Sequence, residues 1–306
     1  MKLATKILKF ALLSTAAACT LCLASCKKEV KTDTKEVGTD FNSINISADV
    51  SDITILPSED EKCRIVNTAP EKVNCTAEIL DKVLNVSISD SRNWFQKLFS
   101  SKMSLTVYLP ENVYKTLTLK TSTGTVSLEK AFTFEDVNLT VDTGDIRVEN
   151  IVCDYLTAKS DTGNVSVGGV RADGKIDITT DTGDVILGKC KSKEIFTKTS
   201  TGDVHLDSVF GVILAISVIT GDIALNNVIA DGKFDIVSNT GDVKFTGCDA
   251  ASVFITTSTG NVVGSFLTDK IVFADTRTGK VDTPKLTNGG KCEITTSTGD
   301  IKITIE

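Results

Sequence analysis

A Thr-Gly dipeptide recurs ten times between residues 123 and 299, always 19 or 20 residues apart, and this period strongly limits the fold. Asp or Asn follows eight of the glycines, and Val or Ile stands two positions after each. A fixed period of this length indicates a repeat architecture whose units pack on their neighbours. The glycines, which we expect at chain corners because glycine tolerates positive φ, are Gly124, Gly144, Gly163, Gly183, Gly202, Gly221, Gly241, Gly260, Gly279 and Gly299.

Apolar and polar residues alternate around each glycine, as at Ile176 and Ile178, and a further apolar position lies seven residues after it. This period of two predicts strands with one buried face. Two strands and two corners are expected in each unit, with the second corner at Ala-Asp-Gly-Lys in 172–175 and 230–233. An antiparallel meander gives no reason for a constant period. The sequence therefore predicts an all-β fold, a parallel β-solenoid (β-helix-like) of about ten 19–20-residue coils and on the order of 50 Å long.

The N-terminus has the pattern of a bacterial lipoprotein signal peptide. Three lysines precede an apolar stretch, residues 10–23, that is too short to span a bilayer comfortably. The tetrapeptide Leu23-Ala24-Ser25-Cys26 then supplies an apolar residue, two small residues and a cysteine for lipid attachment. We predict a signal peptide at 1–25, lipidation of Cys26, a polar tether at 26–40, an N-terminal capping β region at 41–115, and the solenoid repeats at 116–306.

Composition restricts the function. The formal charge is −7, and it becomes −10 when Lys2, Lys6 and Lys9 leave with the signal peptide, which argues against nucleic acid as a partner. His205 is the single histidine, so no mechanism that needs two can operate. No catalytic set, metal site or cofactor is predicted.

The residues after the repeat glycines form a predicted ladder of acidic and amide side chains, one coil apart. Stacked carboxylates could bind Ca²⁺, or each could accept backbone N–H groups at its own corner, as Asp and Asn do in turns. Because Asn and Lys280 interrupt the series, we favour the second interpretation. The ladder contains Asp145, Asn164, Asp184, Asp203, Asp222, Asp242, Asn261 and Asp300.

Cys63 and Cys75 flank a predicted turn at 69–72 and are expected to face each other across a hairpin, where an oxidising compartment would permit a disulfide. The final strand, 301–306, is expected to end the solenoid. It either offers an unpaired edge to another strand or is guarded by Lys302 and Glu306.

Aromatic residues mark two further candidate contact sites. Trp94, Phe95 and Phe99 suit one helical turn that contacts a membrane or partner, or that plugs the solenoid, which we favour. Phe254 and Phe273 are predicted at equivalent outward positions of adjacent coils, where they could bind a sugar face or partner, or lie beneath the capping segment.

The order of features resembles that of bacterial β-strand-repeat proteins labelled "putative adhesins", a family of largely unknown function. The matching features, which extend over about residues 41–306, are a weak first coil ending in Ile53-Thr54-Ile55, the strand Val107-Tyr108-Leu109-Pro110, and then many Thr-Gly-Asp-Val units. The resemblance implies a solenoid in the cell envelope but no particular ligand.

These observations predict a non-enzymatic, lipid-anchored envelope protein with an adhesin-like or scaffold role. Its partners would be the membrane, through Cys26, and a protein or polysaccharide ligand, with the outer membrane favoured over the inner. The alternatives are an accessory or sensor protein that acts on a membrane or signalling partner, and a polysaccharide-active β-helix enzyme.

Overall fold

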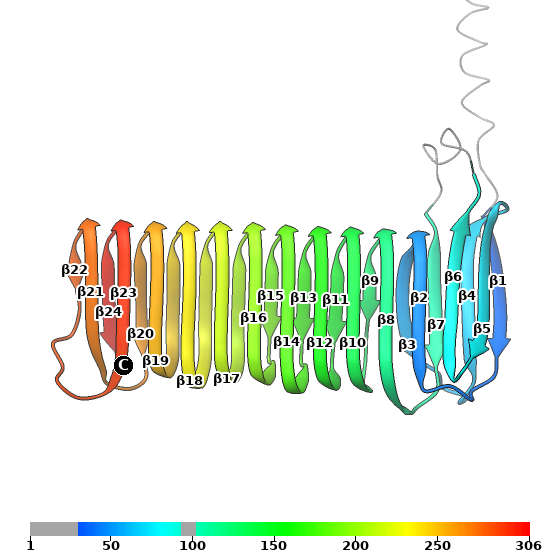
Figure 1. Ribbon diagram of the computed structural model, residues 1–306, viewed down its shortest axis with the longest axis horizontal. Helices are drawn as coiled ribbons and strands as arrows, with labels where there is room; N and C mark the ends of the chain where they lie inside the picture. The colour runs from blue at the N-terminus through cyan, green and yellow to red at the C-terminus, as the bar shows by residue number, and fades with distance from the viewer. Residues whose placement is uncertain (1–29, 93–101) are drawn as a thin grey trace, which may run out of the picture.

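The structure, a computed structural model, describes residues 30–92 and 102–306. It is a parallel β-solenoid in which the strands run across the long axis of a rod (Figure 1). This confirms the predicted fold class. The described residues contain no helix long and apolar enough to cross a membrane.

Each regular coil consists of a long strand, the Thr-Gly corner and a short strand. Long strands pair in parallel with long strands of the next coil, and short strands with short strands, so that Val126, Ile146, Val165 and Val185 stack in one buried column. The long strands are β8 (Val113–Thr123), β10 (Phe132–Thr143), β12 (Ile151–Thr162), β14 (Arg171–Thr182) and β16 (Lys191–Thr201), and the short ones are β9 (Val126–Leu128), β11 (Ile146–Glu149), β13 (Val165–Gly168) and β15 (Val185–Gly188).

The coil has three sides rather than the two that we predicted. The second bend lies six residues after the repeat glycine, where φ is between 51° and 76° in seven successive coils, as at Asn150 and Lys189. The Asp173-Gly174 segment, predicted as the second corner, forms the third bend, where β14 has a bulge opposite the single residue Lys193 of β16. This bulge accounts for the spacings of 20 residues at 163–183 and 221–241, which contain the extra glycines Gly174 and Gly232, whereas the coils next to them have 19 residues between repeat glycines.

The last two coils are stacked in the reverse of their sequence order. Coil 290–305 pairs with coil 252–266 on one side and with coil 270–282 on the other. Figure 1 shows β23 between β19 and β21. The C-terminal strand is therefore not the free end of the stack that we predicted. It pairs along 301–305 with coil 252–266, and at Ile301 and Lys302 also with coil 270–282. The remaining strands here are β17 (Val204–Thr220), β18 (Ile223–Thr240), β19 (Val243–Thr259), β20 (Val262–Phe266), β21 (Lys270–Thr278), β22 (Val281–Asp282), β23 (Gly290–Thr298) and β24 (Ile301–Ile305).

The N-terminal region also departs from sequence order. The coil formed by β2 and β3 lies between the coil of β6 and β7 and the first regular coil of β8 and β9. Antiparallel pairing of β1 with β4, β4 with β7 and β5 with β6 then ends the parallel stack. These strands are β1 (Val30–Val37), β2 (Ser43–Val50), β3 (Asp52–Pro57), β4 (Cys63–Pro70), β5 (Val73–Leu80), β6 (Val83–Asp90) and β7 (Ser104–Leu109).

One continuous apolar core runs through the rod. Near its N-terminal end the rings of Phe41, Tyr114 and Phe134 stack with centroids 5.9 and 5.6 Å apart. At the other end Lys270 is only 2% exposed, and its ammonium group pairs with Asp249 and lies 5.6 Å from the ring centre of Phe266. The long apolar stem of a lysine thus helps to close the core at the last coil.

Candidate functional site

The repeat glycines lie at the corners and approach the neighbouring coil very closely. All ten have φ between 139° and 156°, a region that other residues rarely adopt. At Gly202 an added Cβ would lie 2.0 Å from the carbonyl oxygen of Gly183, and the Thr199 hydroxyl donates to that same oxygen at 3.0 Å. The glycine requirement therefore comes from coil-to-coil contact, and we assign these residues a structural role.

The Asp/Asn ladder caps the corners, but its hydrogen bonds run between coils rather than within one. Asp184 Oδ1 accepts the N–H of Asp203 at 2.9 Å, and Asp203 Oδ1 accepts that of Asp222 at 2.8 Å. The ladder begins earlier than predicted, because Asp52 Oδ1 accepts the N–H of Thr125. No group of three His, Cys, Asp or Glu residues that could hold a metal ion occurs in 30–92 or 102–306.

A surface hollow of about 740 Å³ on the third side of the coils combines cationic and apolar side chains. We call it the basic groove. Its outward residues come from the same position of successive repeats, eight residues after each repeat glycine, and the strand pairing places them in register. Along the axis this row is Val152, Arg171, Lys191, Phe210 and Ile229, and the neighbouring bend adds Asp173, Lys193, Val212 and Asp231.

Small residues form the floor of the groove. Ala172 and Ser192 are buried, and Gly211 occupies the same inward position in the next coil. An added Cβ on Gly211 would lie 3.0 Å from the Ser192 carbonyl oxygen. Sequence reasoning did not identify this site, because no other cation lies beside Arg171 in the linear sequence. Aligning the repeats on their glycines would have revealed it, since Arg171 and Lys191 then share one column.

The phenylalanines of the predicted stripe share an outward column but do not touch. Glu293 of the inserted coil lies between Phe254 and Phe273, so the two are not on adjacent coils as we predicted. Phe254 is half-buried between Lys233 and Lys291, whose ammonium groups lie 4.8 and 5.4 Å from its ring centre. Phe273 is 58% exposed. No continuous aromatic surface results.

The predicted disulfide is absent, because Cys63 and Cys75 are both free, buried thiols. Strand β4 pairs with β1 and β7, whereas β5 pairs with β6, so the two strands do not form the hairpin that we expected. Burial raises the pKa of the Cys63 thiol to about 12. Cys190, Cys248 and Cys292 lie in the core as small apolar residues.

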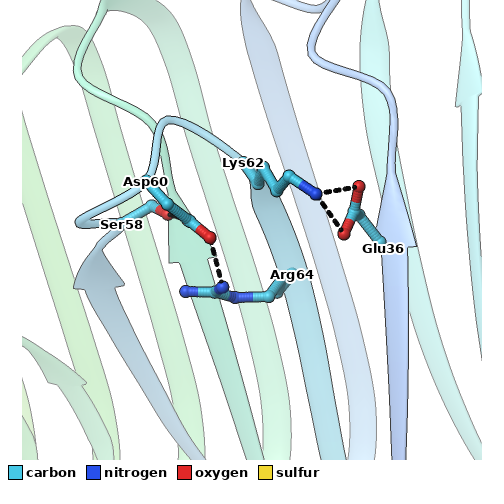
Figure 2. Close-up of polar contacts among 5 residues, drawn as sticks. All are labelled: Glu36, Ser58, Asp60, Lys62 and Arg64. Atoms are coloured by element: carbon cyan, nitrogen blue, oxygen red, sulfur yellow. Dashed lines mark hydrogen bonds and ion pairs between the residues drawn. The ribbon is translucent and has the colours of Figure 1, made fainter.

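A cluster of exposed polar residues joins the first strands of the cap (Figure 2). Lys62 pairs with Glu36 of β1 at 3.0 Å, and Arg64 pairs with Asp60 at 2.6 Å. The Ser58 hydroxyl, which donates to Asp60, and the Arg64 guanidinium hold the pKa of that carboxyl below its usual range. Because every charge here has a partner and is solvated, the cluster offers no free group for a ligand.

Several predicted sites lie outside the described residues. These are the lipidation site Cys26, the signal peptide, and the aromatic segment with Trp94, Phe95 and Phe99. His205 is exposed near the start of β17, at an ordinary surface position.

Comparison with known proteins gives one family match. The model of the Toastrack DUF4097 family matches residues 41–209. Among solved structures, a "putative adhesin" from Bacteroides fragilis has 16% identity and a TM-score of 0.45, with 91% of this chain and 98% of that chain covered. A "putative adhesin" from Parabacteroides distasonis has 16% identity, the same coverages and a TM-score of 0.41. A "putative lipid binding protein" from the same species has 14% identity, a TM-score of 0.32, and coverages of 90% and 97%. No curated protein gives a significant match.

Proposed function

We propose that this chain, which belongs to the Toastrack DUF4097 family, has a non-enzymatic binding role at the cell envelope. In this proposal a lipid on Cys26 anchors the protein, in the outer membrane rather than the inner, and the rod presents a rigid surface to its ligand. The role is adhesin-like or that of a scaffold. A solenoid suits such a role because its backbone is fixed by pairing between coils, whereas its outward side chains are free to vary.

The basic groove is the observation that carries this proposal. It lies on regular coils far from both ends of the rod, and its lining side chains project from strands whose positions are set by their neighbours on both sides. Binding there requires no rearrangement of the backbone, so little conformational entropy is lost when a ligand is bound.

The acids of the groove support a non-enzymatic role. Asp173 and Asp231 lie at the same bend but three coils apart, which corresponds to roughly 14 Å at the usual strand spacing. Paired carboxylates in glycoside hydrolases are closer, at about 5–10 Å. This geometry favours a binding site over the polysaccharide-active enzyme that we considered from sequence.

The experiment uses bacterial cells that produce the full chain, either unchanged or with Cys26→Ala. We expect the unchanged protein in the membrane fraction and the variant in the soluble fraction. Isolated envelope material should retain the purified unchanged protein, and an Arg171→Gln/Lys191→Gln variant should be retained less than a Lys198→Gln control. Retention that is equal in all three would remove the binding role of the groove. If a membrane protein co-purified equally with the unchanged protein and with the groove variant, the accessory or sensor alternative would be favoured.

A further inference from the structure

Among the residues that the structure describes, the cations of the basic groove have no acidic partner, in contrast to several lysines that lie close to an acid on the rod. Lys175, Lys233 and Lys291 each form an ion pair at 2.7 Å with an acid two residues further on. Within the part of the chain that the structure describes, Arg171, Lys191 and Lys193 form no ion pair.

This difference is notable in an acidic protein. Asp173 also lines the groove on the coil next to Lys193, yet the two form no ion pair. The groove contains three cations, on two neighbouring coils, and two acids, Asp173 and Asp231, so it carries a net positive charge near its middle. Such a site is complementary to an anion, and the guanidinium of Arg171 can bind a carboxylate through two parallel hydrogen bonds.

Apolar side chains lie on both sides of these cations along the rod. Val152 is 47% exposed on one side, and Phe210 and Val212 are 39% and 43% exposed on the other. From Val152 to Ile229 the row crosses four coil spacings, which is roughly 19 Å. The matching ligand is thus elongated, has anionic groups near its middle and presents apolar faces beside them.

The backbone hydrogen bonds of these coils favour an acidic glycan over an acidic peptide as the ligand of the groove. The N–H of Lys191 donates to Val170 and that of Phe210 to Cys190, both at 2.9 Å, as part of the pairing between coils. No strand edge is left here for a peptide, whose own backbone groups would remain unpaired on an apolar surface. A sugar chain has no such backbone. Its hydroxyl groups can donate to Asp173 and Asp231, and its C–H faces can pack on Phe210.

We propose that the basic groove binds a linear, carboxylated glycan, with Arg171, Lys191 and Lys193 contacting its carboxylates. This inference rests on the proposed binding function and specifies the ligand class for the same site. In this complex the carboxylates of the glycan lie over the two coils that carry Arg171 and Lys191. Its sugar rings extend over Val152 on one side and Phe210 on the other.

The test measures binding of oligogalacturonate to the full-length protein by titration calorimetry, with the methyl-esterified oligomer as a probe of equal length without charge. We expect binding of the acid, at least about tenfold weaker binding of the ester, and weakening with added salt. Lys191→Gln/Lys193→Gln should lose at least about tenfold in affinity, whereas Lys198→Gln, which removes a charge from the same strand outside the groove, should bind normally. Circular dichroism checks that the variants are folded.

Several results would overturn the proposal: no binding of oligogalacturonate, equal binding of acid and ester, equal losses in the groove and control variants, or tighter binding of polyglutamate than of the glycan. None of these outcomes by itself contradicts the proposed binding function. If envelope material still binds through Arg171 and Lys191, the binding role stands and only the ligand class is wrong.

Discussion

Asp300 Oδ1 accepts the backbone N–H of Lys280 at 2.7 Å, although Lys280 belongs to the preceding unit of the sequence. In each of the other ladder residues the side-chain oxygen accepts the N–H of a unit that follows it in the chain, as Asp203 does from Asp222 and Asn164 from Asp184. The reversal arises because the last coil is inserted beneath the one before it, so that coil 270–282 forms the end of the rod.

Coil order can be tested with disulfides. Thr256 and Thr295 are register partners whose hydroxyls lie 3.4 Å apart. The Thr256→Cys/Thr295→Cys variant should therefore oxidise readily, which mass spectrometry under non-reducing conditions detects. Stacking in sequence order would instead join Thr256 to Asp275. In the inserted order these two are two coils apart, roughly 9–10 Å and beyond disulfide reach, so Thr256→Cys/Asp275→Cys should stay reduced. Oxidation of the second pair alone would refute the inserted order.

The corner glycines should not tolerate a methyl group. Gly202→Ala would place Cβ 2.0 Å from the Gly183 carbonyl oxygen at a φ of 145°, and we expect a loss of more than about 3 kcal/mol in unfolding free energy. Gly188→Ala is the matched control, because nothing lies within 4 Å of its added Cβ, and its effect should stay within about 0.5 kcal/mol. Urea denaturation measures both. Similar losses in the two variants would contradict the close contact between coils.

The ladder should require an acceptor rather than a charge. Asp203→Ala removes the acceptor for the N–H of Asp222 and should cost about 1 kcal/mol. Asp203→Asn should be nearly neutral, because Asn164 already accepts the N–H of Asp184 at 2.8 Å. Thermal melts with and without Ca²⁺ complete the test. A rise in melting temperature with Ca²⁺ that Asp203→Asn abolishes would revive the calcium interpretation.

The buried ion pair between Lys270 and Asp249 lies at the end of the rod. Removing one partner should reduce the free energy of unfolding more than removing the other. Asp249→Ala leaves the ammonium of Lys270 buried without its counter-ion, and we expect a cost of about 3–5 kcal/mol. Lys270→Met should cost less, because the carboxylate of Asp249 keeps the Ala250 N–H and the Thr268 hydroxyl as donors. Denaturant midpoints of the two variants give the comparison, and equal losses would argue against burial of the ammonium.

Buried thiols should make stability fall at high pH. Burial raises the pKa of Cys248 from 9.0 to about 11, so the unfolded chain releases this proton at lower pH than the folded one. The stabilisation is complete below pH 9 and is lost as the pH rises toward 11, with a slope of up to about 1.4 kcal/mol per pH unit. Urea titrations between pH 8 and 10.5 should show a shallower decline for Cys248→Ala. Parallel declines would mean that this thiol ionises normally in the folded protein.

The local pattern of this chain was predictable from sequence, because each repeat specifies its own corner and its own inward residues. Ten Thr-Gly units and their Val or Ile columns determined the parallel solenoid, and the ladder of Asp and Asn residues determined how its corners are capped. The order of the coils at the two ends was not predictable. Coil 290–305 and coil 270–282 carry the same Thr-Gly signal, so the repeat pattern alone does not say which of them pairs with coil 252–266. The groove likewise depends on tertiary structure, since Arg171 and Lys191 are 20 residues apart in the chain and become neighbours only when their coils stack.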